Sequence, residues 1–526
     1  MRREVLDRSA AQAPPTTAPW WERGWVAALL VALSAVPLLW PALPPLTDLP
    51  GHMARWHVSM VHGLGGPLDR YFDFSWATVG NLGMDLIVPA LARLTGLEPA
   101  SKIAVIAIPM ITAAGMLWVA REVHGRTPPA AFFALPLAYA WPFQFGFVNF
   151  TLAQGLAFCA LALWIRLGRQ ERFVLRAALF VPIAAILWLA HLFGWGMFGL
   201  MAFGAELARE RGAGQRWTGA IVRAAGQCLP LAPPLLFMLL AGSGSSGASV
   251  PHELPDPRLK LLWIATVLRD RWRTYDLVCA LIVCALLYRA LRSRDRRFGF
   301  APALGLPALF CAAAFLLLPW RLAGGAHVDM RLLAPTVALA LLALRCPAAS
   351  PRQRRILALA ALAFFAVRTA AMTVSFALRG AEQQSELAAI AHIPRGSTVL
   401  ALVEKPCRAD WRDSRRDHLP GFAIIRRDAF TNEQWDLEGQ QLLKVRYTAG
   451  GRWRADPSQL VFDKACLKGN GFAGAIATFP RAAFAYVWTI GFPPGAAKAR
   501  DLKLVWGNRQ SALYRVIRVT TPATIS

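Results

Sequence analysis

A single acidic residue, Asp48, follows the first long apolar run of the chain, within the segment TDLPGH at 47–52. A carboxylate close to lipid is energetically costly, so by default it marks a functional site. The residues that follow are rich in groups that bind protons, metals or phosphates. This pattern predicts chemistry at the outer face of a membrane, with Asp48 as the catalytic group and three neighbours as candidate pocket residues: His52, Arg55 and His57.

Other roles for this loop remain open. The side chain of Asp48 could simply cap a helix that begins at the next residue. His52 lies four residues later and would share a helix face with Asp48, which makes both residues candidate ligands of a divalent metal cation. No HExxH or comparable ligand spacing accompanies them. The histidines could also form hydrogen bonds at the lipid headgroups, which requires no metal.

A basic residue, Arg331, opens the late apolar segment MRLLAP at 330–335. A planar guanidinium can hold a phosphate through two parallel hydrogen bonds, so this position predicts a phosphate site. Arg331 could instead extend to the membrane interface or pair with Asp329 alone. The basic segment 258–273 is expected on the same outer side, where it would contact anionic lipid nonspecifically or add three arginines to the phosphate site: Arg269, Arg271 and Arg273.

Two other pairs of residues stand out at the outer side. Asn149 and His191 lie at the tips of two predicted helical hairpins, where they could bind the edge of a sugar or satisfy backbone groups. Cys407 and Cys466 are the only two of the eight cysteines in the C-terminal region. In an oxidising compartment they could form a disulfide, and no CxxC spacing suggests redox or zinc chemistry.

The elements that must position these residues are membrane helices. Apolar residues make up 56% of the 526 residues and charged ones only 17%, which predicts a polytopic α-helical membrane protein. The net charge of +26 comes largely from arginines in short loops between apolar runs, as the positive-inside bias requires, so it does not indicate nucleic acid. Apolar length predicts about 11 transmembrane helices, one of them at 129–142.

This reading divides the chain into three parts. Residues 1–23 form a cytoplasmic tail, and residues 24–378 form the transmembrane domain, with outer loops at 42–100 and 242–274 and an amphipathic stretch at 82–94. An odd number of spans in an inner membrane places residues 379–526 outside, as a soluble periplasmic or extracellular domain. Its pattern predicts an α/β fold, with a helix at 382–391 and strands at 397–403, 422–425, 485–490 and 512–519.

The arrangement resembles the GT-C superfamily of integral-membrane glycosyltransferases. The resemblance rests on Asp48 in a long first outer loop with an amphipathic segment, on the Arg-(apolar)-Pro pattern that begins at Arg331, and on an outer domain after the last span. Many members carry a second acidic residue directly after the first, whereas Leu49 stands here. The second carboxylate would then come from another loop, as Glu253, Asp256 or Asp329. This departure from the family pattern leaves metal dependence open.

The resemblance implies a sugar donor carried on a polyprenyl phosphate or diphosphate in the lipid bilayer. Asp48 would act as the general base on an acceptor hydroxyl, which attacks the anomeric carbon from the opposite face and inverts it. Arg331, with the 258–273 segment, would hold the leaving phosphate. Neither the sugar nor the acceptor, whether glycan, lipid or protein, is indicated.

Two functions of other classes fit the same composition. A transporter or flippase for a lipid-linked molecule also needs charges facing a cavity, but it usually shows internal repeats and broken helices near the midplane. No clear repeat is present, and the charges lie at the outer mouth, which favours the enzyme. A non-catalytic envelope assembly protein is the other alternative, and it would tolerate loss of Asp48.

Overall fold

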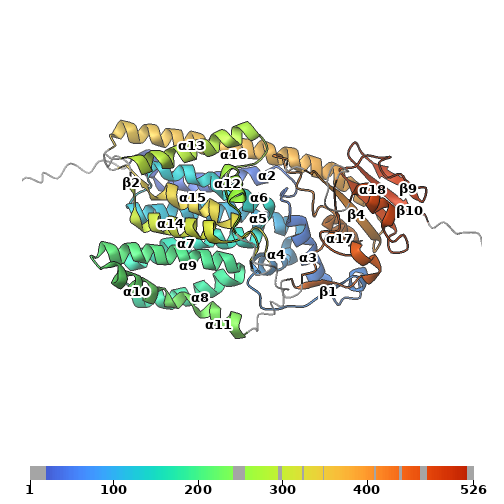
Figure 1. Ribbon diagram of the computed structural model, residues 1–526, viewed down its shortest axis with the longest axis horizontal. Coiled ribbons are helices and arrows are strands. Elements are labelled where there is room, and N and C mark those ends of the chain that lie inside the picture. The colour runs from blue at the N-terminus through green and yellow to red at the C-terminus, as the bar shows by residue number, and fades with distance from the viewer. Residues whose placement is uncertain are drawn as a thin grey trace, which may run out of the picture.

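The computed structural model describes residues 19–240, 255–293, 299–322, 325–346, 349–407, 410–437, 441–462 and 471–517. A bundle of long helices lies beside a C-terminal α/β region, and the helices α3, α4 and α17 lie between them (Figure 1). The α-helices of the first half are α1 (Gly24–Leu33), α2 (Val36–Leu39), α3 (Leu49–Val61), α4 (Gly83–Thr95), α5 (Leu97–His124), α6 (Trp141–Phe145), α7 (Val148–Arg169), α8 (Phe173–Ala190), α9 (Leu192–Gly212), α10 (Trp217–Cys228) and α11 (Pro233–Leu240).

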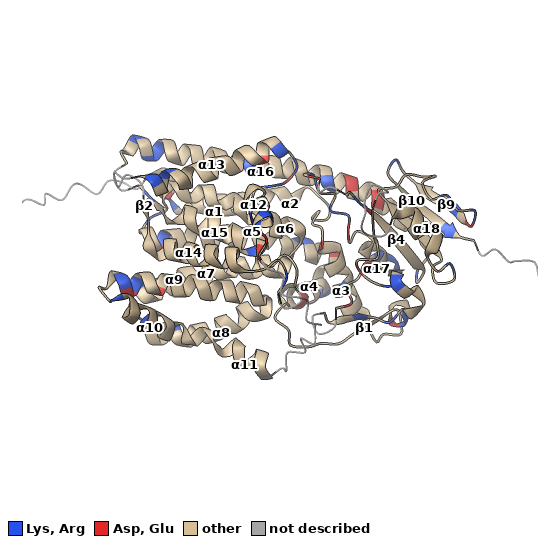
Figure 2. Cartoon of the chain, in the orientation of Figure 1, with Lys and Arg blue, Asp and Glu red and all other residues tan. Residues whose placement is uncertain are grey.

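The second half adds α12 (Pro257–Ala265), α13 (Arg273–Arg292), α14 (Pro302–Leu317), α15 (Met330–Ala343), α16 (Pro351–Leu387), α17 (Gly421–Arg427) and α18 (Phe472–Thr478). Short 3-10 helices are η1 (Trp20–Glu22), η2 (Pro67–Arg70), η3 (Pro129–Tyr139), η4 (Leu229–Leu231), η5 (Ala388–His392) and η6 (Thr448–Trp453). Charged side chains are sparse along the bundle helices and gather at their ends and in the C-terminal region (Figure 2).

Five helices of the described chain are long and apolar enough to cross a membrane: α5, α7, α8, α13 and α16. The pair α10 and α11, bent by 41°, makes a sixth candidate, and three shorter apolar stretches lie at Gly24–Leu39, Pro302–Leu317 and Met330–Ala343. The predicted count of about 11 spans is therefore only partly matched. The span predicted at 129–142 is not an α-helix: its residues 129–139 form the buried 3-10 helix η3, in which Pro136 lacks the backbone N–H that an α-helix would use.

Helix α16 connects the bundle to the C-terminal region. It begins with a capping box formed by Ser350 and Gln353, and its 37 residues run without a break through the predicted boundary at 378. From Ala358 onward its buried residues recur at helical spacing, so one face packs from there to Leu387. The separate helix predicted at 382–391 is instead the end of α16 followed by η5.

The C-terminal region contains a six-stranded mixed sheet in the order β5-β4-β8-β10-β9, with β7 also paired to β4. Its strands are β4 (Thr398–Lys405), β5 (Phe430–Thr431), β7 (Leu460–Phe462), β8 (Tyr486–Ile490), β9 (Leu502–Gly507) and β10 (Ser511–Val516). Strand β4 is parallel to β5, β7 and β8, whereas β10 is antiparallel to β8 and β9. Three of the four predicted strands thus lie in this sheet.

The fourth predicted strand, 422–425, is wrong: these residues lie in helix α17, which packs against α3. All but the last of them are buried, and a short apolar run gives no period that separates a helix from a strand. The predicted amphipathic stretch at 82–94 does form a helix, α4.

The bundle and the C-terminal region share one hydrophobic core cluster, which contains Leu38, Met53 and Phe376 together with Val399 and Trp488. In addition, β1 (Phe72–Phe74) of the first predicted outer loop pairs with β6 (Leu443–Val445) of the C-terminal region. Within the bundle, β2 (Gly299–Phe300) pairs with β3 (Leu344–Arg345), which joins the start of α14 to the end of α15. The C-terminal region is therefore packed onto the loop that carries Asp48.

Cys407 is disulfide-bonded. Its predicted partner, Cys466, lies outside the described residues, so this pairing stays a prediction.

Candidate functional site

Asp48 is fixed at the start of α3 by the turn that follows α6. Its backbone N–H donates to the carbonyl oxygen of Phe145 at 2.9 Å. The next residue in that turn, Gly146, has a φ of 99°, and a Cβ there would lie 2.7 Å from the Asp48 nitrogen. Only glycine allows this approach, so the turn and Asp48 are seated together.

The carboxylate of Asp48 makes no hydrogen bond that caps α3, although Asp48 occupies the N-cap position. Capping by the side chain therefore does not account for this residue. Burial, helped by the nearby Asp417 and Asp456, raises the pKa of Asp48 to about 7, although the charge of His418 acts to lower it. A carboxylate with a pKa near neutrality is suited to accept a proton at physiological pH.

His418, from the C-terminal region, is the nearest cationic group to Asp48. Its Nε2 lies 3.9 Å from Oδ1 of Asp48, and its Nδ1 lies 2.9 Å from Oε2 of Glu433. Trp435 covers the imidazole, with ring centroids 4.2 Å apart. Burial alone would lower the pKa of His418, but the hydrogen bond to Glu433 and the charges of Asp456, Glu433 and Asp48 raise it to about 10.

Lys405, at the end of β4, adds a second cation to this side of the site. Its Nζ forms an ion pair of 2.6 Å with Asp417. Burial by itself would lower the pKa of Lys405, but Asp417 and, more weakly, Asp48 raise it. Asp48 is thus placed among charges of both signs, all brought by residues 405–456.

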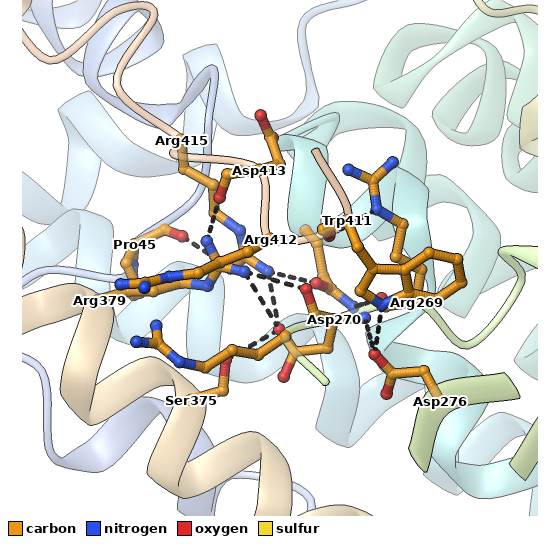
Figure 3. A network of polar contacts seen from close by, with 12 residues as sticks. Pro45, Arg269, Asp270, Asp276, Ser375, Arg379, Trp411, Arg412, Asp413 and Arg415 are labelled. Carbon is orange, nitrogen blue, oxygen red and sulfur yellow. Dashed lines mark hydrogen bonds and ion pairs between the residues drawn. The ribbon is translucent and has the colours of Figure 1, made fainter. Parts of the chain in front are cut away.

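A buried polar network holds the segment that carries Asp417 and His418 against the bundle (Figure 3). Arg415 donates to the carbonyl oxygen of Pro45 at 2.9 Å and to Oδ1 of Asp270 at 3.1 Å. Arg379, on α16, donates to the carbonyl oxygen of Asp270 at 3.0 Å and to that of Asp413. Arg415 lies three residues before His418 in the chain, and its partner Pro45 lies three residues before Asp48. The network therefore holds His418 and Asp48 opposite each other.

Asp270 holds this network together, so Asp270→Asn is expected to destabilise the fold. Its carboxylate is only 3% exposed, and its loss removes the acidic partner that is in direct ion-pair contact with the buried Arg415. Removing one partner of a buried pair costs roughly 3–5 kcal/mol. Thermal unfolding of the purified protein in detergent measures this loss.

Arg395→Gln is the control for this prediction. Arg395 also pairs with an aspartate, Asp428, but its side chain is 73% exposed, so the unfolding free energy should change by less than about 1 kcal/mol. Equal unfolding midpoints for Asp270→Asn and Arg395→Gln would contradict a structural role for the network.

Arg331, in the first turn of α15, is buried among aromatic rings. Its guanidinium lies 4.4 Å from the centroid of Phe147, and one nitrogen donates to the carbonyl oxygen of Ala326 at 3.3 Å. Asp329 does not hold it, because the carboxylate of Asp329 forms an ion pair of 2.6 Å with Lys260. The alternative in which Arg331 pairs with Asp329 alone therefore does not apply.

His191 orients the guanidinium of Arg331. Nη1 of Arg331 donates to Nε2 of His191 at 2.9 Å, and the backbone N–H of Phe193 approaches the other ring nitrogen, Nδ1, at 3.1 Å. A neutral imidazole has one acceptor nitrogen, so it cannot accept both hydrogen bonds in full. Nε of Arg331 is buried without a hydrogen-bond partner among the described residues. An anionic oxygen beside Arg331 could accept from this Nε–H.

Asp48 and Arg331 come close together although 283 positions separate them, since 331 − 48 = 283. Phe145, which accepts from the Asp48 backbone, and Phe147, which lies under Arg331, are two residues apart. The Asp48 carboxylate also stabilises the charge of Arg331 through space. The structure thus brings the two main predicted residues to one place at the end of the bundle beside the C-terminal region.

Two of the predicted pocket residues belong instead to a structural network between α3, α4 and α7. Arg55 forms two hydrogen bonds to the carboxylate of Asp85, at 2.9 and 3.0 Å, and a third to Gln441. The side chain of Asn149 accepts from the backbone of Met84 at 2.5 Å and donates to Asp85 at 3.0 Å. These contacts consume most of their hydrogen-bonding capacity.

The remaining histidines of the first loop differ in their placement. His57 pairs with Asp428 at 2.8 Å, away from Asp48. His52 lies beside Trp435, at 5.1 Å between centroids, and burial, with Arg55 and His418, lowers its pKa well below the usual value. A neutral His52 therefore lies beside the same indole ring, that of Trp435, as His418 does.

The arginines of the basic segment are engaged with the protein. Arg269 donates to the carbonyl oxygens of Trp411 at 2.9 Å and Asp410 at 2.6 Å, and Arg271 pairs with Glu382 at 3.2 Å. Arg273 is exposed at the start of α13. Asp256 is exposed and caps α12 through the N–H of Arg258, and Glu253 lies outside the described residues.

Within the residues that the structure describes, no group of three or more His, Cys, Asp or Glu side chains is placed to hold a metal ion. Of the two predicted metal candidates, Asp48 lies beside His418 and His52 lies beside Trp435. Metal binding by this pair stays a prediction.

Sequence reasoning missed every site residue of the C-terminal region: Lys405, Asp417, His418, Glu433, Trp435 and Asp456. They lie on loops and strand ends with no fixed spacing among them, so no motif marks them. The sequence holds one indirect signal, in the segment RRDHLPG at 415–421. Three charged residues stand directly before His418, and Gly421, which packs closely against Pro50, follows three residues later.

Neither a family model nor a curated protein matches this chain. Two solved structures do: ArnT from Cupriavidus metallidurans in the apo state, with a TM-score of 0.50, 17% identity and coverage of 93% of this chain and 97% of that one, and the same protein bound to undecaprenyl phosphate, with a TM-score of 0.51, 15% identity and coverage of 94% and 98%. The alignment spans both the bundle and the C-terminal region. The chain therefore has the fold of ArnT over nearly its whole length, which agrees with the resemblance stated around Asp48 and Arg331.

Proposed function

We propose that this protein is a membrane glycosyltransferase that moves a sugar from a polyprenyl phosphate or diphosphate donor to an acceptor hydroxyl. The observation that carries the proposal is the pairing of a buried, uncapped carboxylate at Asp48 with a buried guanidinium at Arg331 that has donors to spare. Each charge is costly where it lies, and a substrate that needs a base at one end and a phosphate site at the other explains both.

The reaction follows from this arrangement. Asp48 takes the proton of the acceptor hydroxyl as its oxygen forms a bond to the anomeric carbon. The bond between that carbon and the phosphate oxygen breaks, and the lipid phosphate leaves with the electron pair without needing a proton. Arg331, oriented by His191, stabilises the charge that grows on it through its unpartnered Nε–H. Attack from the face opposite to the phosphate inverts the anomeric centre.

The solved ArnT structure with undecaprenyl phosphate supports a lipid of this class as a ligand here. Undecaprenyl phosphate is therefore the first ligand to test, because a binding experiment with it can be done before the sugar is known. Binding should raise the thermal midpoint of the purified protein, whereas undecaprenol, which lacks the phosphate, should not. Sugar transfer is then measured with a panel of polyprenyl-phosphate sugars, with release of the lipid phosphate as the readout. Equal effects of the two lipids would contradict the phosphate site.

We also propose the topology that this function requires: an inner-membrane protein with its N-terminus in the cytoplasm and residues 379–526 on the periplasmic or extracellular side. A reporter fused after Arg297 should be read as cytoplasmic, and one fused after Ser526 as external. A cytoplasmic signal from the second fusion would place the site on the other face, where a different donor pool would serve it.

A further inference from the structure

His418 is surrounded by carboxylates from three separate segments. Glu433, just after β5, binds its Nδ1 at 2.9 Å. Asp48, at the start of α3, and Asp456, before β7, each place an Oδ1 at 3.9 Å from its Nε2. The imidazole is 4% exposed and the Glu433 residue is fully buried, so water does not compete strongly for these groups.

The two sides of the ring are not equivalent. Nδ1 is committed, because it meets both the carboxylate and the backbone oxygen of Glu433 at 2.9 and 3.0 Å. The contacts of Nε2 are too long for hydrogen bonds. Its N–H thus faces two carboxylates and is bound to neither, and a small shift of the Asp48 side chain would complete one bond at the expense of the other.

We propose that His418 is a positioning residue for Asp48: a cationic imidazole, fixed by Glu433, whose Nε2–H binds one carboxylate oxygen of Asp48 and leaves the other oxygen free for the acceptor hydroxyl. This inference rests on the proposed function and adds the group that prepares the base. His418 takes no proton in the reaction, since Asp48 accepts it and later returns it to solvent.

The charges around the pair support this role. A buried carboxylate tends to stay protonated, and a protonated Asp48 could not act as a base. Among the groups that face it, His418 and Lys405 favour its ionised form, whereas Asp417 and Asp456 oppose it. Glu433 at Nδ1 and Asp456 at Nε2 keep the ring of His418 cationic, and the neighbouring His52 stays neutral. His418 is the largest favourable charge on Asp48.

The decisive experiment is the pH dependence of kcat/KM for sugar transfer in His418→Gln. Because His418 lowers the pKa of Asp48, its loss should raise that pKa and move the acid limb of the profile to higher pH. A move of about one unit would lower the rate about tenfold at acidic pH, and most of this loss should disappear at high pH. The KM for the lipid donor should change little, because His418 does not face the phosphate site.

Two further variants protect this test against simple misfolding. Glu433→Gln retains the imidazole but weakens its charge, so its acid limb should move in the same direction by less. Asp456→Asn removes a carboxylate that raises the pKa of Asp48 and competes for Nε2, so its acid limb should move to lower pH. A merely structural role would lower the rate equally at all pH values and would not give opposite shifts. His392→Gln, an exposed histidine in η5 of the same region, is the control with an unchanged profile.

The outcomes separate this inference from the function beneath it. If the wild-type protein transfers sugar, Asp48→Asn does not, and the acid limb of His418→Gln stays in place, His418 is not a positioning residue and the glycosyltransferase proposal stands. If the wild-type protein transfers no sugar from any donor of the panel and undecaprenyl phosphate does not bind, both proposals are overturned. Opposite shifts in His418→Gln and Asp456→Asn support both.

Discussion

Sugar transfer by Asp48→Asn should fall by about 10²–10⁴-fold, the usual cost of losing a general base. The substitution retains the size and shape of the side chain and removes only its ability to accept the proton. Transfer is measured as release of the lipid phosphate and as labelled product. Because the Asp48 side chain makes no capping bond, the change should not unfold α3. It also removes a buried charge, so the thermal midpoint should stay equal to or above that of the wild type.

Undecaprenyl phosphate should still stabilise Asp48→Asn, since Asp48 does not bind the phosphate in the proposed mechanism. A matched control is Asp428→Asn, which changes another aspartate that contacts α3, through His57, but lies away from the site. Its transfer rate should stay within about twofold of the wild type. Near-normal transfer by Asp48→Asn would exclude general base catalysis by this residue and would favour the transporter or the assembly protein instead.

The sequence predicted Asp48 and Arg331 as site residues but not the residues of the C-terminal region that surround Asp48. Asp48 and Arg331 were found because a charge beside an apolar run is costly and therefore conspicuous, whatever the fold. The family resemblance drew on these two positions, the long first outer loop and the domain after the last span, and the fold that it implied agrees with the match to ArnT. His418 and Glu433 are buried in the fold, but in the sequence they lie in the C-terminal region, where charged residues are frequent and carry no such signal.

The first outer loop shows why a dense group of polar residues is a poor guide to one site. On helix α3, at about 100° per residue, His57 points to the side opposite to Asp48, and it pairs with Asp428 there. Arg55 lies on the same face as Asp48 but about 10 Å further along the axis, where it meets Asp85. Helical geometry separates these residues, but their partners come from α4 and the C-terminal region and were not predictable locally.

The C-terminal sheet was predictable where strands were long and buried, as in β4, and not where a short apolar run had two solutions. Residues 422–425 form a helix because α3 and the sheet lie on either side of them, a tertiary effect that overrides local preference. The unbroken length of α16 was also missed. Its polar residues past 378 suggested a new element, whereas in the structure two of them, Arg379 and Gln383, donate to the buried network around Asp270 and Arg415.

Arg331→Lys should lower transfer by about 10²–10³-fold, as is typical when an electrostatic contact to a developing oxyanion is removed. Lysine retains the charge, but its single ammonium cannot reproduce the planar fork that meets Ala326 on one side and faces His191 on the other. The loss should appear in kcat, and stabilisation by undecaprenyl phosphate should weaken as well. Arg331→Gln should lose that stabilisation altogether.

His191→Gln separates the phosphate site from a purely structural role of Arg331. The amide oxygen of glutamine can accept from Nη1 of Arg331 as Nε2 of His191 does, so binding of undecaprenyl phosphate should be weakened less by His191→Gln than by His191→Ala. Arg452→Gln, an exposed arginine that also lies over an aromatic ring, Trp453, is the matched control and should leave binding unchanged. If Arg331→Lys and His191→Ala both bind the lipid phosphate as the wild type does, the phosphate lies elsewhere. Arg331 would then only fill the aromatic pocket formed by Phe147, Phe150 and Phe193.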